Sequence, residues 1–573
     1  LEFRRVLFRS GFQIKPNMKS IEIHPTQPLI GLQLPRDEVY QLACSYLRGG
    51  RLDSADPLFQ ALLQQNTEDP DVLGMLGALR LSQGHVDAAV QMCQRAHQLD
   101  PSTPLHIINL ASALFALEQS DDAIALLQKA CIEHPDHVMA HYNLGNFLRD
   151  TKRPQEACVS YMNALQIDPQ HLNAMNNLGT VLIDLGRYTE ADAMFRRVLE
   201  IDAANASASG NLALLAATQG QDQNAVDLYN QVPPSNDPRL NAGVRFNQSL
   251  SLIRIGNYEL GFPLYEWRWR GSPTLYHLYR FTPEQQWRGE PLQGKRLLVW
   301  GEQGFGDTLQ FVRYLGLVAE RQPARLTLLT HPALLRLFKL SLPPTVEVLE
   351  RSTMPSPELG PEWDFHCPIM SLALAIAHPE PVRKSQVPRE SPYLRADEAE
   401  VLRWEKKLSG IEPERPLRVG LSWRTGQKDN GGRSFGLDEA MPLMNLPGVR
   451  FYRLTRTEPT RPTEETPEGL NLIDLSADLH DFAATAAFMK CLDLVLSVDT
   501  SVLHLAGALG VPTLGVYPTY GGNFFDVGEG EQTWYPKVTV WRQTTMGDWQ
   551  GLLTRVAQHL MQMRQRAEVV EAV

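Results

Sequence analysis

The sequence predicts a multidomain chain in which an all-α repeat superhelix is followed by an α/β region of two parallel-sheet lobes. Two observations lead to this prediction. In the N-terminal half, a leucine and an alanine each recur every 34 residues without an insertion. In the C-terminal half that period is lost, and short apolar strand-like segments alternate with helical ones. Such alternation is typical of parallel sheets covered by helices.

The leucine and alanine series stay in register through six repeats. The two series are Leu42, Leu76, Leu110, Leu144, Leu178 and Leu212, and Ala55, Ala89, Ala123, Ala157, Ala191 and Ala225. A period of 34 residues is the length of a tetratricopeptide (TPR) helix–turn–helix unit. The small alanine permits close helix contact, and Pro101, Pro135 and Pro169 end second helices because proline cannot continue one. The sequence resembles TPR proteins over about residues 36–230.

A seventh, degenerate unit follows at residues 246–270, with Gly261 in the place of the repeat alanine. Its Trp267 and Trp269 are expected either to pack against the next domain or to belong to the core of a capping helix. The sequence leaves both interpretations open.

Four asparagines stand immediately before repeat leucines, again 34 residues apart: Asn109, Asn143, Asn177 and Asn211. This position of a TPR unit tends to face the concave groove. A side-chain amide has one acceptor and two donors, which match the backbone of an extended peptide. The series predicts an acceptor peptide groove and resembles the asparagine ladder of the nucleocytoplasmic O-linked N-acetylglucosamine transferase. The alternative is that these amides only pack between helices.

Composition restricts the class of partner. The 573-residue chain has a net charge of −11, whereas a general nucleic-acid binder needs a basic surface. Its six cysteines are scattered without CxxC pairs, so reduced cytoplasmic thiols are expected rather than disulfides or a metal site. The sequence contains no run of about 18 apolar residues, which a membrane-spanning helix would need. A cytoplasmic location is therefore expected.

The first residues, LEFRRVLFRS, include neither an initiator Met nor the apolar region of a signal peptide. We expect a non-native or disordered start, with Met18 as the natural first residue. The expected divisions of the chain are 1–17 (non-native or disordered), 18–35 (lead-in), 36–270 (TPR solenoid), 271–412 (first α/β lobe) and 413–573 (second lobe with a terminal helix).

The C-terminal half contains two blocks of strand–helix alternation. The expected strands are 295–300, 325–330 and 346–350 in the first block, and 417–423, 449–454, 470–475, 494–498 and 513–517 in the second. Helices are expected between them, notably at 481–492 and from Ser501. In parallel sheets of this Rossmann-like kind, ligands bind outside the carboxyl ends of the strands. The two lobes are therefore expected to face a cleft.

Two strand ends have residues suited to chemistry. The first has Gly304, Gly306 and Asp307 in a glycine-rich turn, where the backbone can approach a substrate closely. This turn lacks a Walker lysine and is not G-x-G-x-x-G, so the glycines alone are weak evidence. Asp307 is either a reactive carboxylate or a plain helix N-cap.

The second strand end has Asp499, Thr500 and Ser501 at the start of a helix of small residues. Free N–H groups and the helix dipole favour an anion at such a terminus. His504 lies one turn further on. It is either a ligand-binding residue or a hydrogen-bonded structural histidine.

These two segments, with DFAATAA (481–487) and GLSWRTGQKDNGGRS (420–434), resemble glycosyltransferases of the GT-B fold. They are most similar to the lipopolysaccharide heptosyltransferase-like family, in the version that follows TPR repeats in bacterial proteins. The resemblance covers about residues 271–565. It implies a metal-independent transferase, but leaves open whether the sugar is a hexose, a heptose or a nonulosonate.

The resemblance also implies roles for the matching positions. Asp307 is expected to be the general base. Cations are expected to neutralise the departing phosphate, because GT-B enzymes generally work without a bound metal; for Lys428 the alternative is a solvated basic loop. The residues expected to bind the donor are Gly304, Gly306, Arg424, Lys428, Arg433, Asp499, Thr500, Ser501 and His504. Two departures put the donor in doubt: Ala484 replaces an acidic residue, and residues 519–533 lack the usual Trp/Arg-rich sequence.

The function expected from this layout is transfer of a sugar from a nucleotide-sugar donor to a protein that the TPR groove recruits. The layout is similar to that of O-linked N-acetylglucosamine transferase and of flagellin glycosyltransferases. The nucleotide sugar is a substrate, and no metal or other cofactor is expected. Two alternatives remain: a TPR scaffold with an inactive transferase domain, and transfer to a glycolipid or polysaccharide.

Overall fold

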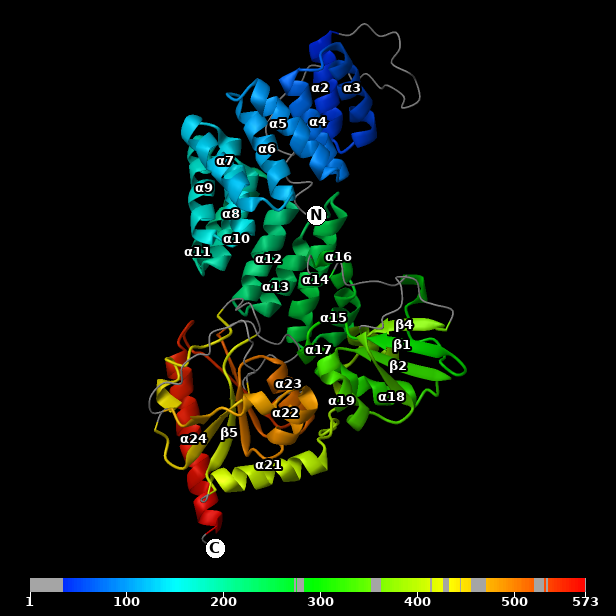
Figure 1. Ribbon diagram of the computed structural model, residues 1–573, viewed down its shortest axis with the longest axis vertical. Coiled ribbons are helices and arrows are strands. Elements are labelled where there is room, and N and C mark those ends of the chain that lie inside the picture. The colour runs from blue at the N-terminus through cyan, green and yellow to red at the C-terminus, as the bar shows by residue number, and fades with distance from the viewer. Residues whose placement is uncertain are drawn as a thin grey trace. The chain divides into compact units, whose positions relative to one another are not determined.

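The computed structural model describes residues 35–571 apart from internal segments. These segments are 273–274, 276–282, 352–361, 413–414, 426–431, 444, 455–469, 520–529 and 532–533. The chain divides into two compact units, Leu1–Leu215 and Ala216–Val573 (Figure 1). The expected non-native start and most of the lead-in lie outside the described residues.

The first unit consists of successive antiparallel helix pairs (Figure 1), which confirms the predicted all-α repeat architecture. Its helices are α2 (Arg36–Arg48), α3 (Leu52–Gln65), α4 (Pro70–Gln83), α5 (Val86–Leu99), α6 (Pro104–Ala116), α7 (Ser120–Glu133), α8 (Val138–Asp150), α9 (Pro154–Ile167), α10 (Leu172–Asp184) and α11 (Tyr188–Ile201). Helix α12 (Ala206–Thr218) crosses the division between the units.

Small residues on the first helix of a pair receive a larger side chain from the second helix. The receiving and inserted residues are Gly77 with Cys93, Gly145 with Tyr161, and Gly179 with Phe195. A Cβ atom built on Gly145 would lie 2.7 Å from the ring of Tyr161. Close-packed interiors do not tolerate such overlap, so glycine is required where these helices touch.

The second unit begins with helices that continue the repeat pattern: α13 (Asp222–Gln231), α14 (Pro238–Arg254), α15 (Tyr258–Tyr265) and α16 (Arg268–Gly271). The interpretation that these tryptophans pack against the next domain holds for Trp269, whereas Trp267 is half-buried and contacts an arginine. Trp269 packs on Trp300 of the first lobe, with ring centroids 5.7 Å apart. Trp267 instead lies under the guanidinium of Arg245 on α14, 4.3 Å from its ring centroid.

The first α/β lobe is a parallel sheet of order β3-β2-β1-β4. Its strands are β1 (Arg296–Trp300), β2 (Arg325–Thr330), β3 (Val346–Glu350) and β4 (Phe365–Pro368), and its helical segments include α17 (Phe305–Phe311), η2 (Val312–Tyr314), α18 (Leu315–Ala319), α19 (Pro332–Ser341), η4 (Ile369–Ser371) and α20 (Leu372–Ala377). Strand β4 was not predicted, because its four residues Phe-His-Cys-Pro show no apolar alternation.

The second lobe has the order β10-β11-β9-β8-β5-β6-β7, with only β10 antiparallel among the described strands. The strands are β5 (Leu417–Ser422), β6 (Val449–Arg453), β7 (Leu472–Ile473), β8 (Leu494–Ser497), β9 (Thr513–Tyr517), β10 (Gly530–Glu531) and β11 (Val538–Arg542). The last two were not predicted. The helices are α21 (Glu398–Ile411), α22 (Phe482–Met489), α23 (Ser501–Ala508) and α24 (Trp549–Glu571). Two parallel-sheet lobes confirm the predicted α/β class.

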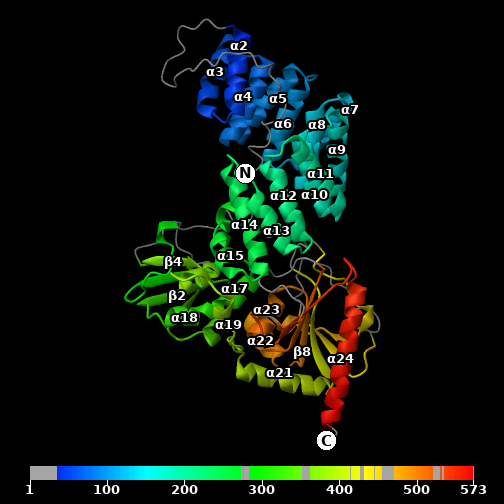
Figure 2. The same ribbon diagram turned by 180° about the vertical axis from the view of Figure 1, so that it is seen from behind.

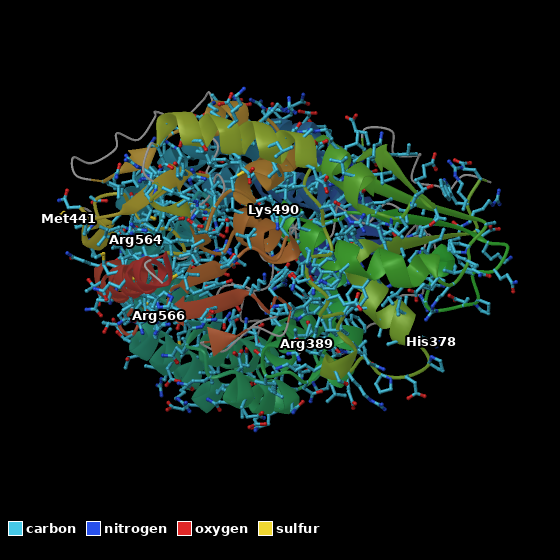
Figure 3. The ribbon with its side chains drawn as sticks, turned by 90° about the horizontal axis from the view of Figure 1, so that it is seen from below. His378, Arg389, Met441, Lys490, Arg564 and Arg566 are labelled. Atoms are coloured by element: carbon cyan, nitrogen blue, oxygen red, sulfur yellow. The ribbon has the colours of Figure 1, made fainter. Side chains whose placement is uncertain are left out.

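Helix α24 closes one face of the second lobe. Leu553, Val556 and Leu560 are fully buried in the core that includes β5 and β8. Figure 3 shows Arg564 and Arg566 on this helix near Met441, whose side chain is 57% exposed. None of the described helices combines the length and apolarity that a bilayer span requires. All six cysteines are unpaired, as the spacing predicted.

Candidate active site

The two strand ends singled out in the sequence meet inside the second unit. Strand β1 leads through the glycine-rich turn into α17, and β8 leads through Asp499 and Thr500 into α23. Helices α17 and α23 pack against each other (Figure 2). A Cβ atom on Gly306 would lie 2.7 Å from Cδ2 of His504. The glycine therefore permits the close approach of the lobes at this point.

Asp307 lies in the first turn of α17, whose N-cap is Gly304. It is therefore not the N-cap that the alternative interpretation predicted. Burial, together with the negative charge of Asp499, raises the pKa of its carboxyl from 3.8 to about 6, against hydrogen bonding from the backbone at Gly304 and Asp307. The carboxylate is still ionised at neutral pH, but it is more basic than an ordinary aspartate.

Asp499 lies at the carboxyl end of β8, and its side chain is 10% exposed. Burial raises its pKa to about 6, although the positive charges of Arg433 and Arg542 act in the opposite direction. One Oδ atom of Asp499 lies 3.7 Å from the guanidinium of Arg433. Two arginines therefore converge beside the start of α23, one from the loop after β5 and one from the end of β11.

The start of α23 is partly capped by its own residues. Thr500 is the N-cap, and its hydroxyl accepts a hydrogen bond of 3.3 Å from the N–H of Val502. It also lies 3.2 Å from the hydroxyl of Ser497. Ser501, the first residue of the helix, is half-buried. One N–H group of the predicted anion site is thus already used within the protein.

His504 is buried between the two lobes. Its Nδ1 lies 2.9 Å from the hydroxyl of Tyr535, and its Nε2 lies 3.9 Å from Asp499. Burial lowers its pKa to about 3, helped by the charge of Arg313. The ring is therefore neutral and hydrogen bonded, as the structural interpretation of this histidine expected; contact with a donor stays a prediction.

The remaining predicted residues are placed less completely. Arg424 follows β5 and is exposed, while Lys428 lies outside the described residues. The unusual sequence at 519–533 also lies largely outside them. Ala484 is in the first turn of α22, where its N–H donates a hydrogen bond of 2.7 Å to the carboxylate of the N-cap Asp481. Asp481 in turn pairs with Arg336 of the first lobe at 2.7 Å.

Sequence reasoning missed Arg313, which, like Arg336, contacts residues beyond the first lobe. Arg313, on η2, is 8% exposed and donates to the carbonyl oxygens of Trp534 (2.7 Å) and Pro388 (2.9 Å) and to the hydroxyl of Tyr393 (3.0 Å). These partners come from the second lobe and from the segment between the lobes. Neither Trp534 nor Arg542 was among the predicted site residues.

In the first unit, three of the four predicted ladder asparagines bond to the first helix of the preceding repeat. Their amide nitrogens donate as follows: Asn109 to the carbonyl of Gly74 (3.1 Å), Asn177 to Asn146 (2.9 Å) and Asn211 to Asn176 (2.9 Å). Asn143 is 1% exposed, and neither of its amide atoms has a hydrogen-bond partner among the described residues. These contacts fit packing between helices, and the peptide groove stays a prediction.

Protein-family models match both the repeat region and a segment of the second α/β lobe. Tetratricopeptide-repeat models match residues 40–104, 80–145, 136–204 and 176–239. The model of glycosyltransferase family 9 (heptosyltransferase) matches residues 464–526, which include Asp499, Thr500 and His504. The chain thus combines TPR repeats with a segment similar to heptosyltransferases.

Among curated proteins, Protein FlbA of Caulobacter vibrioides (strain ATCC 19089 / CIP 103742 / CB 15) is 30% identical over 344 residues, which are 55% of this chain and 54% of the relative. The chain thus spans about half the length of this relative. Similar solved structures include PilF of Pseudomonas aeruginosa (18% identity, TM-score 0.30, 34% of this chain and 89% of that one). A thermophilic TPR protein of Thermus thermophilus is also similar (22% identity, TM-score 0.29, 30% of this chain and 95% of that one). So is a TPR protein of Parabacteroides merdae ATCC 43184 (16% identity, TM-score 0.34, 42% of this chain and 94% of that one).

Proposed function

We propose that this chain, with its TPR repeats and its family 9 segment, is a glycosyltransferase that moves a sugar from a nucleotide-sugar donor to a protein acceptor. One observation supports the proposal most directly. The carboxyl of Asp307 lies close enough to Asp499 for the two charges to interact, and Asp499 lies beside Arg433 and Arg542. A base on one lobe thus faces cations on the other.

The proposed reaction uses these groups in distinct ways. Asp307 takes the proton of an acceptor hydroxyl as the oxygen attacks the anomeric carbon of the donor. The bond from that carbon to the phosphate oxygen breaks, and the nucleotide leaves with the electron pair. Arg433, Arg542 and the start of α23 stabilise the negative charge on the leaving phosphate. Asp499 has the same sign of charge as a phosphate, so its role is to orient Arg433 rather than to contact the donor.

In this proposal the two arginines take the place of a divalent cation, the nucleotide sugar is a substrate, and no cofactor is needed. Turnover is therefore expected to be unchanged by EDTA.

The test begins with thermal shift. The full chain is incubated with UDP-N-acetylglucosamine, UDP-glucose, GDP-mannose, ADP-heptose and a CMP-linked nonulosonate, because a ligand that binds the native state raises Tm. Turnover of the donor that shifts Tm most is then measured. Asp307→Asn is expected to reduce it by about 100-fold or more with the Tm shift retained, while the exposed Asp438→Asn serves as control. No shift with any donor would favour the scaffold alternative; full turnover by Asp307→Asn would refute the assignment of the base.

The acceptor class needs a separate experiment. Asn109 and Asn143 are buried, so the half-exposed pair Asn177 and Asn211 offers the cleaner test of the groove. Replacing this pair by alanine is expected to reduce modification of co-expressed proteins, measured by mass spectrometry, while hydrolysis of the donor stays the same. Equal loss of both activities would argue against the peptide groove. Modification of glycolipid alone would support the alternative acceptor.

A further inference from the structure

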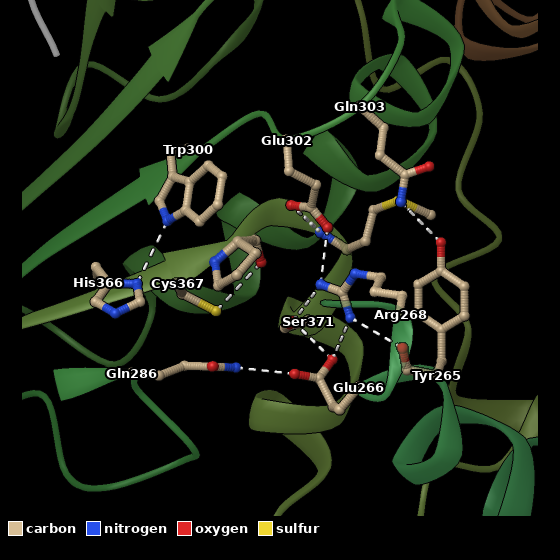
Figure 4. A network of polar contacts seen from close by, with 12 residues as sticks. Tyr265, Glu266, Arg268, Gln286, Trp300, Glu302, Gln303, His366, Cys367 and Ser371 are labelled. Atoms are coloured by element: carbon tan, nitrogen blue, oxygen red, sulfur yellow. Dashed lines mark hydrogen bonds and ion pairs between the residues drawn. The ribbon is translucent and has the colours of Figure 1, made fainter. Parts of the chain in front are cut away.

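A buried arginine links the repeat-derived helices to the glycine-rich turn. Arg268, on α16, is 0% exposed. Its guanidinium donates to Glu302 (2.8 Å) and Ser371 (2.8 Å) through one terminal nitrogen, and to Glu266 (2.6 Å) through the other (Figure 4). Glu266 precedes α16, Glu302 lies in the turn after β1, and Ser371 ends η4. One side chain therefore joins three segments.

A second contact holds the same turn to the same helices. The side-chain amide of Gln303 donates to the hydroxyl of Tyr265 at 2.9 Å (Figure 4). Tyr265 lies close enough to Asp307 for the aspartate charge to add to burial in raising the pKa of its phenol. Two successive residues of the turn that leads to Asp307 are thus held by α15 and α16.

The charges of this cluster explain why arginine occupies the position. Two carboxylates surround one guanidinium, and the side chains of Glu302 and Arg268 are both fully buried. Burial raises the pKa of Glu302 to about 7, although Arg268 opposes the rise. Burial acts the same way on Glu266, but the charge and hydrogen bonds of Arg268 keep the pKa of that carboxyl low. Breaking a buried ion pair leaves an uncompensated charge, so the turn and the helices are strongly coupled through Arg268.

We propose that Arg268 is a positioning residue of the transfer reaction: by holding Glu302 it fixes the glycine-rich turn and thereby the place of Asp307. This inference rests on the proposed transferase function. It makes the degenerate repeat a part of the catalytic unit, beyond any role in recruiting an acceptor. A pair that served folding alone would have no specific effect on the turn or on the chemical step.

The test compares Arg268→Lys with Arg270→Lys in the full chain. Arg270 is exposed on the same helix and provides the matched control. A lysine retains the charge, but its single ammonium lacks the planar fork that contacts Glu266, Glu302 and Ser371 together. For Arg268→Lys we expect amide hydrogen exchange in residues 301–311 to rise at least about tenfold and kcat to fall at least about tenfold. KM for the donor is expected to stay within about twofold, since Arg433 and Arg542 belong to the other lobe.

A second variant separates positioning from folding. Arg268→Met combined with Glu266→Gln and Glu302→Gln removes the guanidinium together with both carboxylates that it contacts, so neither glutamate is left as an unpaired buried charge. We expect it to unfold cooperatively near the wild-type Tm, yet to retain the fast exchange in 301–311 and the low kcat. Wild-type kcat in this triple variant would overturn the proposal.

The other outcomes are equally decisive. Unchanged exchange in Arg268→Lys, or fast exchange with wild-type kcat, would overturn the positioning role. An equal effect of Arg270→Lys would do the same, because it would show a general response of α16. If the wild-type chain itself turns over none of the five donors, the proposed function fails and the inference falls with it. The wild-type measurement thus distinguishes the two failures.

Discussion

Asp307 and Asp499 come from different lobes, and each has a pKa of about 6 where an isolated aspartate has 3.8. Burial is the largest cause in both, and the charge of Asp499 also acts on Asp307. A nearby negative charge disfavours the ionised form of a carboxyl, so the charge of Asp499 makes Asp307 more basic. The candidate base is therefore tuned by its neighbour across the contact between α17 and α23.

This coupling predicts a pH dependence. A base must be ionised, so kcat/KM of the donor reaction should fall as pH drops through about 6 and level off above about 7. Asp499→Asn removes the negative charge that raises the pKa of Asp307, so the acid limb should move to lower pH by up to about one unit. Measuring kcat/KM between pH 4.5 and 8 for the wild type and Asp499→Asn gives the midpoint of this acid limb, with Asp438→Asn as control. A limb that stays in place or moves to higher pH would contradict the coupling.

In the first unit, paired helices pack closely because a large side chain of one helix occupies the space beside a glycine of the other. Tyr161 occupies the space where a Cβ of Gly145 would stand, and its hydroxyl donates 2.7 Å to Asn146. The ring therefore has little freedom to move aside. The repeat period is thus expressed in packing, because the same small-to-large contact recurs between α8 and α9 and between α10 and α11.

Gly145→Ala should destabilise the first unit by about 1–3 kcal/mol, the usual effect of overpacking a core. Thermal unfolding followed by circular dichroism measures the change in the full chain. Gly410→Ala on α21 is the control, because no atom lies within 4 Å of its built Cβ. This control should be neutral or stabilising, since alanine favours helix. A neutral Gly145→Ala would show that the pair of helices can separate at little cost.

For the molecule as a whole, the compact units divide after Leu215, although we expected the solenoid to end at residue 270. The expected boundary at residue 270 marks the end of the repeat pattern in the sequence and stays a prediction. The compact units are instead defined by contacts between residues. Tyr258, Phe262 and Tyr265 are at most 2% exposed and belong to one hydrophobic cluster with Trp287 and Leu297 of the first lobe. The last repeat-like helices therefore complete the core of the first α/β lobe.

This shared core predicts how truncated chains behave. Residues 216–573 should unfold cooperatively, whereas residues 272–573 should not, because their first lobe loses three buried aromatic side chains and Arg268. Each large aromatic side chain contributes about 3–5 kcal/mol in a core, which exceeds the margin of most domains. Size-exclusion chromatography and thermal scans of both fragments measure the outcome. Cooperative unfolding of 272–573 would show that the first lobe folds without these helices.

Local patterns were sufficient for much of this protein. The 34-residue period predicted the helix pairs because a repeat must bury the same face each time, and the apolar runs predicted the central strands. The two strand ends were found because ligands bind at the carboxyl ends of parallel strands. Strands β1 and β8 belong to different sheets, however, so the meeting of these two ends was decided by the packing of the lobes. Strands β4 and β10 were missed because four and two residues are too few to show a period, whereas β11 has five alternating residues (VTVWR) and was overlooked.

Side-chain partners between distant segments were decided by the tertiary structure. Arg433, Asp499 and Arg542 come together from three separate strand ends, and no spacing in the sequence indicates the cluster. Arg268 looks like a surface arginine between two tryptophans, yet it is fully buried with Glu302. Burial and charge pairing depend on which elements cover a residue, and this is a property of long-range packing rather than of neighbours along the chain.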